Sequence, residues 1–181
     1  SRSVTFITDF TAQSVEQADV IIMGFCKGEP FLCIPELVNR KNRGVIGLIN
    51  DPPGDRSALP FCLSEMNFIS RQAPLVEFRR ALLNAWPGEQ NKPGGAVNRP
   101  CSKCPHKTLT YRQTKILAHL CNGKSVPEIA HELMLNPKNV YAHKYLAMQK
   151  FELRGDYEML ALVSAMLANS SQRNLISEYL H

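Results

Sequence analysis

Two helix-start signals lie close together between Leu109 and Arg154, and they constrain the fold of this chain more than any other feature. Ser125 is followed three residues later by Glu128, the spacing of a capping box, in which each residue's side chain bonds the other's backbone N–H. Asn136 and Pro137 repeat the signal, with Asn as the N-cap and Pro at the first helical position. The segment is therefore predicted to contain a helix of about eight residues, a tight turn and a second helix, which is a helix-turn-helix.

The second helix, residues 137–151, is predicted to have two unlike faces. Val140, Ala147, Met148 and Phe151 recur at helical spacing and are expected to face a core. The outward set is Lys138, Asn139, Tyr141, Ala142, Tyr145 and Gln149, flanked by His143, Lys144 and Lys150. A helix that is polar, aromatic and basic on its outer side is suited to the major groove of DNA. The alternative is a small helical bundle with a solvated basic face.

These outward residues divide by their chemistry. Lys144 and Lys150 are long cations that can reach phosphate oxygens, which position a helix without reading sequence. Asn139 can bond a phosphate near the helix start, where the helix dipole favours anions. Contacts with base edges are expected from the centre of the face, which holds Tyr141, Ala142 and Tyr145.

Charge is distributed unevenly along the chain. Residues 1–86 carry nine Lys or Arg and nine Asp or Glu, residues 87–154 carry eleven and four, and residues 155–181 carry one and three. The formal net charge of +5 is therefore concentrated on the predicted helix-turn-helix and the segment before it. This segregation is the expected footprint of a phosphate-binding domain.

Strands and helices alternate in the first half of the chain. The predicted strands are residues 4–8, 19–25, 44–50 and 66–70, the predicted helices are residues 34–40 and 74–86, and residues 14–18 fit the end of a helix. This alternation predicts a parallel α/β sheet. Pro, Gly and charged residues then dominate residues 87–107, which are predicted to link two domains. We expect an α/β domain at 1–86, an all-α domain at 108–170 and a tail at 171–181.

The last predicted helix, residues 156–169, has an apolar stripe wider than one small core needs. Its apolar residues include Met159, Leu160, Leu162, Val163, Met166 and Leu167. Residues 109–154 are predicted to form three short helices, and part of the stripe is expected to pack on them. The surplus suggests a dimer surface, for which Leu160, Val163 and Leu167 are the candidates.

The C-terminal third resembles a known family. Leu109-Thr110, Arg112, Leu117, Gly123, Glu128-Ile129-Ala130, Lys138, Val140, His143 and Lys150 stand in the order found in the LuxR-type helix-turn-helix domain of bacterial transcription regulators. His143-Lys144, Ala147-Met148 and Lys150 are most similar to the Rcs phosphorelay regulators of enteric bacteria. The resemblance implies a four-helix domain that binds double-stranded DNA as a homodimer or as a heterodimer with a related response regulator. Gln113 and Tyr141 stand where this family usually has Glu and often has Lys, which affects base preference.

An α/β domain ahead of a LuxR-type domain resembles the layout of response regulators. In receivers, one strand ends on a phospho-accepting Asp and a later strand carries a Lys that pairs with the phosphoryl group. Residues 18–25 are similar to the first strand, with Gly24 in the place of Asp, and residues 68–74 are similar to the second, with Ser70 in the place of Lys. An acyl phosphate needs a carboxylate nucleophile, so the resemblance implies a degenerate receiver that is not phosphorylated. An unrelated small α/β domain is the alternative.

Cys101, Cys104 and His106 form an incomplete candidate for a metal or redox site. Two thiolates and an imidazole can ligate Zn²⁺, and a CxxC beside a Lys can be redox-active. Closed zinc sites normally have four ligands, so we expect neither a metal nor a cofactor. The remaining cysteines, Cys26, Cys33, Cys62 and Cys121, stand among apolar residues and are expected to be buried thiols.

The sequence therefore favours a bacterial DNA-binding transcription regulator that is not an enzyme. A protein-interaction adaptor whose basic helix does not read DNA is the second hypothesis, and an enzyme or redox protein built on the CxxC is the third. No apolar run reaches the length of about 18 residues that spans a membrane, and no basic-plus-apolar leader is evident. A cytoplasmic protein is expected.

Overall fold

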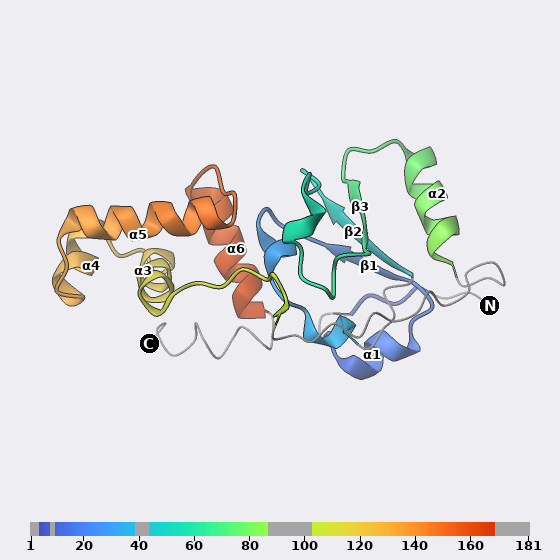
Figure 1. The fold of residues 1–181 in the computed structure, drawn as a ribbon, viewed down its shortest axis with the longest axis horizontal. Coiled ribbons are helices and arrows are strands. Elements are labelled where there is room, and N and C mark those ends of the chain that lie inside the picture. The colour runs from blue at the N-terminus through green and yellow to red at the C-terminus, as the bar shows by residue number, and fades with distance from the viewer. Residues whose placement is uncertain (1–3, 8–9, 39–43, 87–102, 169–181) are drawn as a thin grey trace.

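The computed structural model describes residues 4–7, 10–38, 44–86 and 103–168, which form an α/β part and a helical part (Figure 1). The α/β part runs α1 Ala12–Gln17, β1 Ile21–Gly24, the 3-10 turns η1 Glu29–Phe31 and η2 Pro35–Leu37, β2 Val45–Ile49, η3 Arg56–Ala58, β3 Asn67–Ser70 and α2 Leu75–Ala85. The helical part comprises α3 Tyr111–Cys121, α4 Val126–Glu132, α5 Pro137–Lys150 and α6 Asp156–Ala168. The predicted combination of a parallel α/β part and a four-helix part is confirmed.

The three strands form one parallel sheet in the order β1-β2-β3. Ile22 lies opposite Ile46, and Leu48 lies opposite Ile69. Because side chains alternate along a strand, Val45 and Ile49 face the cluster under α1, whereas Ile46 faces α2. Figure 1 shows α1 and α2 on opposite sides of the sheet. Both faces of β2 are therefore covered, which explains why its sequence is a continuous apolar run.

Two predicted elements of the first half are wrong in extent or in kind. Residues 4–7 form no strand, and their side chains lie in solvent, with Phe6 95% exposed. No strand within the described residues pairs with them, so their β-branched composition alone does not produce a ladder. The helix predicted at 34–40 is reduced to the 3-10 turn η2, and its last two residues lie outside the described ranges. The other strands and the helix at 74–86 are confirmed with slightly shorter ends, and the helix end at 14–18 is found in α1, which begins at Ala12 and ends at Gln17.

The helical part holds a small core of its own where α3, α4 and α5 meet. Ile116, Ile129, Ala130 and Val140 are buried together there. Val140 is one of the positions on residues 137–151 that helical periodicity assigned to an inner face. None of the described helices is both long and apolar enough to cross a bilayer.

A second cluster joins the helical part to the α/β part. Phe31 and Leu32 from the end of η1, with Leu59 after η3, are buried among side chains of α3, α5 and α6. The Lys107 backbone N–H donates to the Phe31 carbonyl at 2.9 Å, and the Lys107 ammonium lies 3.3 Å from the centre of the Phe31 ring. The two parts therefore share one apolar core in addition to their separate ones.

Candidate nucleic-acid interface

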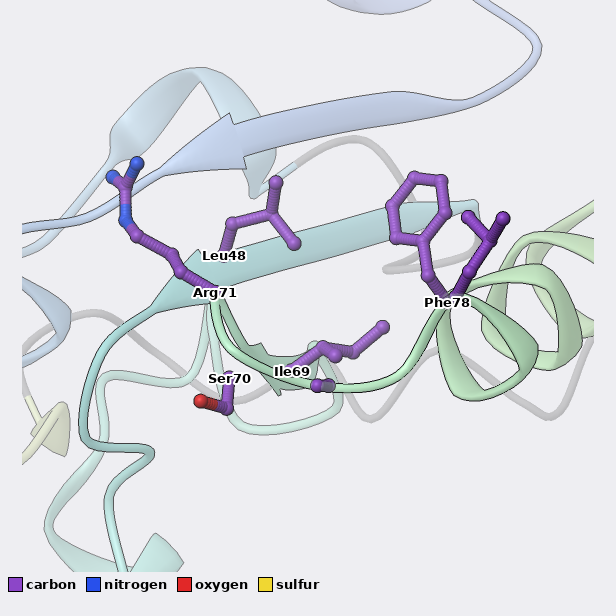
Figure 2. Close-up of a pocket in the computed structure, with 7 residues that line it drawn as sticks. Leu48, Ile69, Ser70, Arg71 and Phe78 are labelled. Carbon is purple, nitrogen blue, oxygen red and sulfur yellow. The ribbon is translucent and has the colours of Figure 1, made fainter.

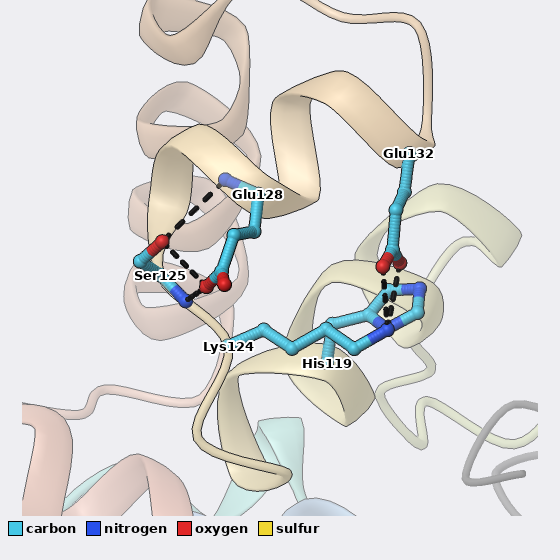
Figure 3. Close-up of polar contacts among 5 residues, drawn as sticks. All are labelled: His119, Lys124, Ser125, Glu128 and Glu132. Atoms are coloured by element: carbon cyan, nitrogen blue, oxygen red, sulfur yellow. Dashed lines mark hydrogen bonds and ion pairs between the residues drawn. The ribbon is translucent and has the colours of Figure 1, made fainter.

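The start of α4 has the predicted capping box (Figure 3). The Ser125 N–H donates to Glu128 Oε2 at 2.7 Å, and the Ser125 hydroxyl donates to the same oxygen at 2.6 Å. These hydrogen bonds lower the pKa of Glu128. The carboxylate therefore stays ionised at the positive end of the helix, which fixes where α4 begins.

The ends of α3 and α4 are tied together by a charged group that the sequence did not indicate (Figure 3). Lys124 Nζ donates to both carboxylate oxygens of Glu132, at 2.8 and 2.7 Å, and this lowers the pKa of Glu132. His119 Nδ1 lies 3.7 Å from Glu132 Oε2, too far for a hydrogen bond. Burial is the main cause that lowers the pKa of His119, followed by the charge of Lys124. Lys124 is thus already ion-paired with a carboxylate of the same domain.

The turn between α4 and α5 is short and held by backbone hydrogen bonds. The Leu135 N–H donates to the Ala130 carbonyl at 2.8 Å, and Met134 adopts a φ of 51° with its side chain in solvent. Asn136 Oδ1 then accepts the Lys138 N–H at 2.9 Å, which caps α5. The second predicted start signal is therefore confirmed, and it sets the angle at which α5 leaves the turn.

The inner face of α5 is the predicted one. Val140, Ala147 and the following Phe151 are buried, and Met148 is half-buried against the shared core. Because this face is fixed by packing, the orientation of the outer face is fixed as well.

The outer face of α5 presents six of the nine residues predicted for DNA contact. Lys138, Asn139, Tyr141, Ala142, Tyr145 and Gln149 are all exposed. Tyr141 is 58% and Tyr145 61% exposed, and Gln149 Nε2 donates to the Tyr145 hydroxyl at 3.1 Å. Leu146 is also 52% exposed on this helix and was missed. Because Leu is apolar, the sequence did not predict this side chain on the outer face, and its exposure is seen only in the structure.

The three flanking residues are half-buried, and the two lysines have partners inside the chain. Lys144 Nζ lies 2.7 Å from Asp156 Oδ1 at the start of α6. Lys150 Nζ donates to the Thr108 carbonyl at 2.9 Å and to Gln113 Oε1 at 3.4 Å. These contacts link α5 to α6 and to the start of α3, so the lysines hold the helix in place in this structure.

The candidate dimer residues on α6 fall in three different environments. Val163 is buried within its own chain, Leu167 is half-buried beside the shared core, and Leu160 is 40% exposed. The wide apolar stripe is thus partly accounted for by packing against Phe31 in the α/β part. Leu160 is the candidate with the most surface available to a second chain.

The incomplete CxxC site is only partly within the described residues. Cys101 lies outside them, Cys104 Sγ accepts the Phe61 N–H at 3.3 Å, and His106 Nδ1 is buried without a hydrogen-bond partner. Within the described ranges, no group of three His, Cys, Asp or Glu side chains could hold a metal ion.

The carboxyl end of the sheet carries the positions compared with a receiver site. The Arg71 guanidinium lies beside Gly24, where an added Cβ would come within 2.8 Å of it, and donates to the Phe25 carbonyl at 3.5 Å. Figure 2 shows Arg71 extending from the end of β3, where it lines a pocket of about 340 Å³ together with residues that include Leu48, Ile69 and Phe78. Gly24 ends β1, one residue before the predicted strand end at Phe25, and Ser70 ends β3 as predicted.

Comparison with known proteins identifies the helical part. Residues 107–163 match the family described as "Bacterial regulatory proteins, luxR family". "Response regulator UvrY" of Escherichia coli (strain K12) is 31% identical over 61 residues, which span 34% of this chain and 28% of that relative. The chain thus covers less than a third of the relative's length. The match confirms the resemblance seen in residues 109–150.

Two solved structures are similar over most of the chain at low identity. "Structure of two RcsB dimers bound to two parallel DNAs" has a TM-score of 0.47 and 21% identity, covering 82% of this chain and 76% of that one. The RcsB response regulator of Salmonella typhimurium has a TM-score of 0.36 and 20% identity, covering 82% and 77%.

Proposed function

We propose that this chain, whose residues 107–163 form a LuxR-type helix-turn-helix domain, is a DNA-binding transcription regulator that inserts α5 into the major groove. The observation that carries the proposal is the outer face of α5. Most of its exposed side chains are polar, aromatic or basic, and its inner face is packed in a core. A helix held in this way can present the same side chains to base edges in every encounter.

We assign two kinds of contact to this face. Tyr141, Ala142 and Tyr145, at its centre, are the candidates for reading bases. Lys138 is exposed near the start of α5 and is the cation best placed for phosphate, with Asn139 beside it. Lys144 and Lys150 contribute to phosphate binding if they exchange their internal partners for phosphate oxygens.

We also propose that the α/β part acts without phosphorylation. Gly24 offers no carboxylate, and the Arg71 guanidinium lies against it. Asp51, just after the end of β2, is already paired, 3.5 Å from Lys27 Nζ and 2.5 Å from an Arg154 nitrogen. On this proposal a small-molecule phosphodonor leaves the protein unmodified and its DNA affinity unchanged. Detection of an acid-labile phosphate on residues 1–86 would contradict it.

Dimerisation on DNA is part of the same proposal. The partner is a second copy of this chain or a related LuxR-type regulator. Leu160 and Leu167 remain the proposed contact residues, whereas Val163 is buried within its own chain. The solved RcsB structure is described as dimers bound to DNA, which is a statement about that protein. A cytoplasmic location follows from the proposed role.

The exposed aromatic residues also favour a second function, a protein-interaction adaptor. Tyr141, Tyr145 and Leu146 are exposed on one helix, and aromatic residues are enriched in protein interfaces. A salt series separates the two functions, because a protein that binds several phosphates loses DNA affinity steeply with salt. Binding of the full chain to genomic fragments and to random DNA, measured at several salt concentrations, is the first test. Weak, salt-insensitive binding to both would favour the adaptor.

Two substitutions then distinguish a residue that contacts bases from a residue that contacts phosphates. Tyr141→Ala is expected to cost about 1–3 kcal/mol on the specific site and little on random DNA. Lys144→Ala is expected to weaken binding to both DNAs alike and to reduce the salt slope by about one unit. The control is Tyr157→Ala, which removes a tyrosine that is 85% exposed on α6.

The internal ion pair of Lys144 requires a matched variant. Asp156→Ala removes the partner at 2.7 Å but keeps the Lys144 cation. If Lys144 binds phosphate, Asp156→Ala retains or increases DNA affinity. If both substitutions weaken binding equally, Lys144 acts only by holding α5 against α6, and its assignment to phosphate fails.

A further inference from the structure

Two cysteine thiols from separate segments of the α/β part lie in contact. Cys33, between η1 and η2, and Cys62, in the turn between η3 and β3, have their sulfur atoms 4.0 Å apart. The Ile34 N–H donates to Cys62 Sγ at 3.3 Å, which holds the sulfur beside the neighbouring cysteine. Cys62 is buried and Cys33 is half-buried, so one sulfur of the pair is closer to solvent.

The two thiols differ in acidity for a reason visible in this geometry. The Cys62 thiol donates to Cys33 Sγ, and this hydrogen bond lowers the pKa of Cys33 to about 7 in spite of partial burial. The same contact, together with burial, raises the pKa of Cys62. A thiolate is the reactive form of cysteine, so Cys33 is the sulfur that reacts first with an oxidant and Cys62 is the thiol that reacts second.

We propose that Cys33 and Cys62 form a reversible disulfide when the protein meets a peroxide. The Cys33 thiolate attacks one peroxide oxygen, the O–O bond breaks, and Cys33 becomes a sulfenic acid while hydroxide leaves. The Cys62 sulfur then attacks Cys33 Sγ, the S–O bond breaks, and water leaves with the Cys62 proton. Each sulfur is oxidised by one electron overall and the peroxide is reduced by two. A small dithiol reverses the reaction by exchange.

The remaining described cysteines provide internal comparisons. Cys26 and Cys121 are half-buried, and burial raises the pKa of each thiol, to about 12 for Cys26. Cys104 is the nearest competitor, because its sulfur accepts the N–H of Phe61, the residue before Cys62. A disulfide needs the two sulfur atoms at about 2.05 Å, so the Cys33–Cys62 pair must close by about 2 Å.

The test uses the folded full chain and hydrogen peroxide. After oxidation, free thiols are blocked with iodoacetamide and the chain is digested with trypsin. Trypsin places Cys33 in residues 28–40, Cys62 in residues 57–71, Cys104 in residues 104–107 and Cys121 in residues 116–124. We expect residues 28–40 to be joined to residues 57–71, with a mass lower by two hydrogens, and the link to disappear with dithiothreitol. A link from 57–71 to 104–107, or a link that forms only in the unfolded chain, would overturn the proposal.

A pair of variants at Cys62 tests the role of its hydrogen bond. Cys62→Ser retains a donor, whereas Cys62→Ala removes it, and neither can form the disulfide. We expect Cys33 in Cys62→Ala to react with iodoacetamide at neutral pH about threefold to tenfold more slowly than in Cys62→Ser, because less thiolate is present. Cys121→Ser is the control and should leave both the link and the rate unchanged. Equal rates in the two Cys62 variants would show that Cys33 is not activated by Cys62. If Cys62→Ala does not fold, the peptide map of the wild-type chain decides alone.

Discussion

Arg154, just after the end of α5, donates to the carboxylate of Asp51, just after the end of β2, at 2.5 Å. The contact joins residues 103 positions apart and bridges the α/β part and the helical part. Gly28 packs against Phe151 and Leu153 across the same boundary, and Lys107 Nζ lies 3.3 Å from Glu152 Oε1. The end of the proposed recognition helix is therefore attached directly to the loops at the carboxyl end of the sheet.

The ion pair itself is expected to contribute little to this attachment. The Arg154 side chain is 72% exposed, and exposed ion pairs stabilise proteins by about 0–1 kcal/mol. We predict that Asp51→Ala and Arg154→Ala each lower the free energy of unfolding by less than about 1 kcal/mol. The measurement is a urea unfolding series that includes the double variant. A coupling energy well above this range would mean that the ion pair, and not apolar packing, holds the two parts together.

Gly28 is predicted to be far more sensitive. Its φ of +84° disfavours any other residue, and an added Cβ would lie 3.0 Å from the Phe151 carbonyl oxygen and 3.0 Å from Leu153 Cδ2. Gly123 is a matched control, because it has a φ of +79° with nothing within 4 Å of an added Cβ. Gly123→Ala should cost about 1 kcal/mol of backbone strain, and Gly28→Ala should cost at least about 1 kcal/mol more. Equal losses in urea unfolding would show that the two parts are not in contact at Gly28 in solution.

The sequence predicted the local structure well because the signals are local. Both capping signals, Ser125 with Glu128 and Asn136 with Pro137, act within one helical turn, and each is found where expected. The inner face of α5 followed from periodicity for the same reason. The strand predicted at residues 4–8 was wrong over 4–7, because a strand needs a partner and composition does not supply one.

The contacts across the boundary could not be predicted in the same way. Phe31, Asp51 and Gly28 have no unusual sequence context, and their partners lie roughly a hundred residues away. The partners of Lys144 and Lys150 were missed for a related reason. A lysine on a helical flank has the same sequence pattern whether it binds phosphate or a group of its own chain such as Asp156. Only the folded structure shows which of these partners the lysine has.

His119 is predicted to make stability depend on pH. Its pKa is lowered in the folded state, mainly by burial and then by Lys124 and Lys115, although Glu132 opposes this shift. The unfolded chain, with a histidine pKa of about 6.5, therefore binds a proton first, and stability is lost as pH falls through and below that value. His119→Gln should flatten the change in unfolding free energy between about pH 7.5 and 5.5. The pKa of Glu132 is also lowered in the folded state. The loss of stability that its protonation causes occurs at more acidic pH, below the pKa of about 4.3 that Glu has in the unfolded chain. An unchanged slope in the variant would mean that His119 titrates normally.

The last prediction separates the proposed dimer surface from the core of α6. Leu160 is 40% exposed, whereas Val163, on the same helix, is 1% exposed among residues of its own chain. Val163→Asp buries a charge without a partner and is expected to unfold the helical part whatever the oligomeric state, at a cost of several kcal/mol. Leu160→Asp places its charge at the surface and should leave the circular dichroism spectrum and the unfolding midpoint nearly unchanged. If Leu160 lies in the dimer interface, this variant should sediment as a monomer under conditions where the wild type associates, and DNA binding should weaken because two half-sites are no longer held together.

Ser164→Asp, at an exposed α6 position, controls for added negative charge near DNA. A folded Leu160→Asp protein that associates and binds DNA like the wild type would remove Leu160 from the interface, and with it the main support for dimerisation through α6.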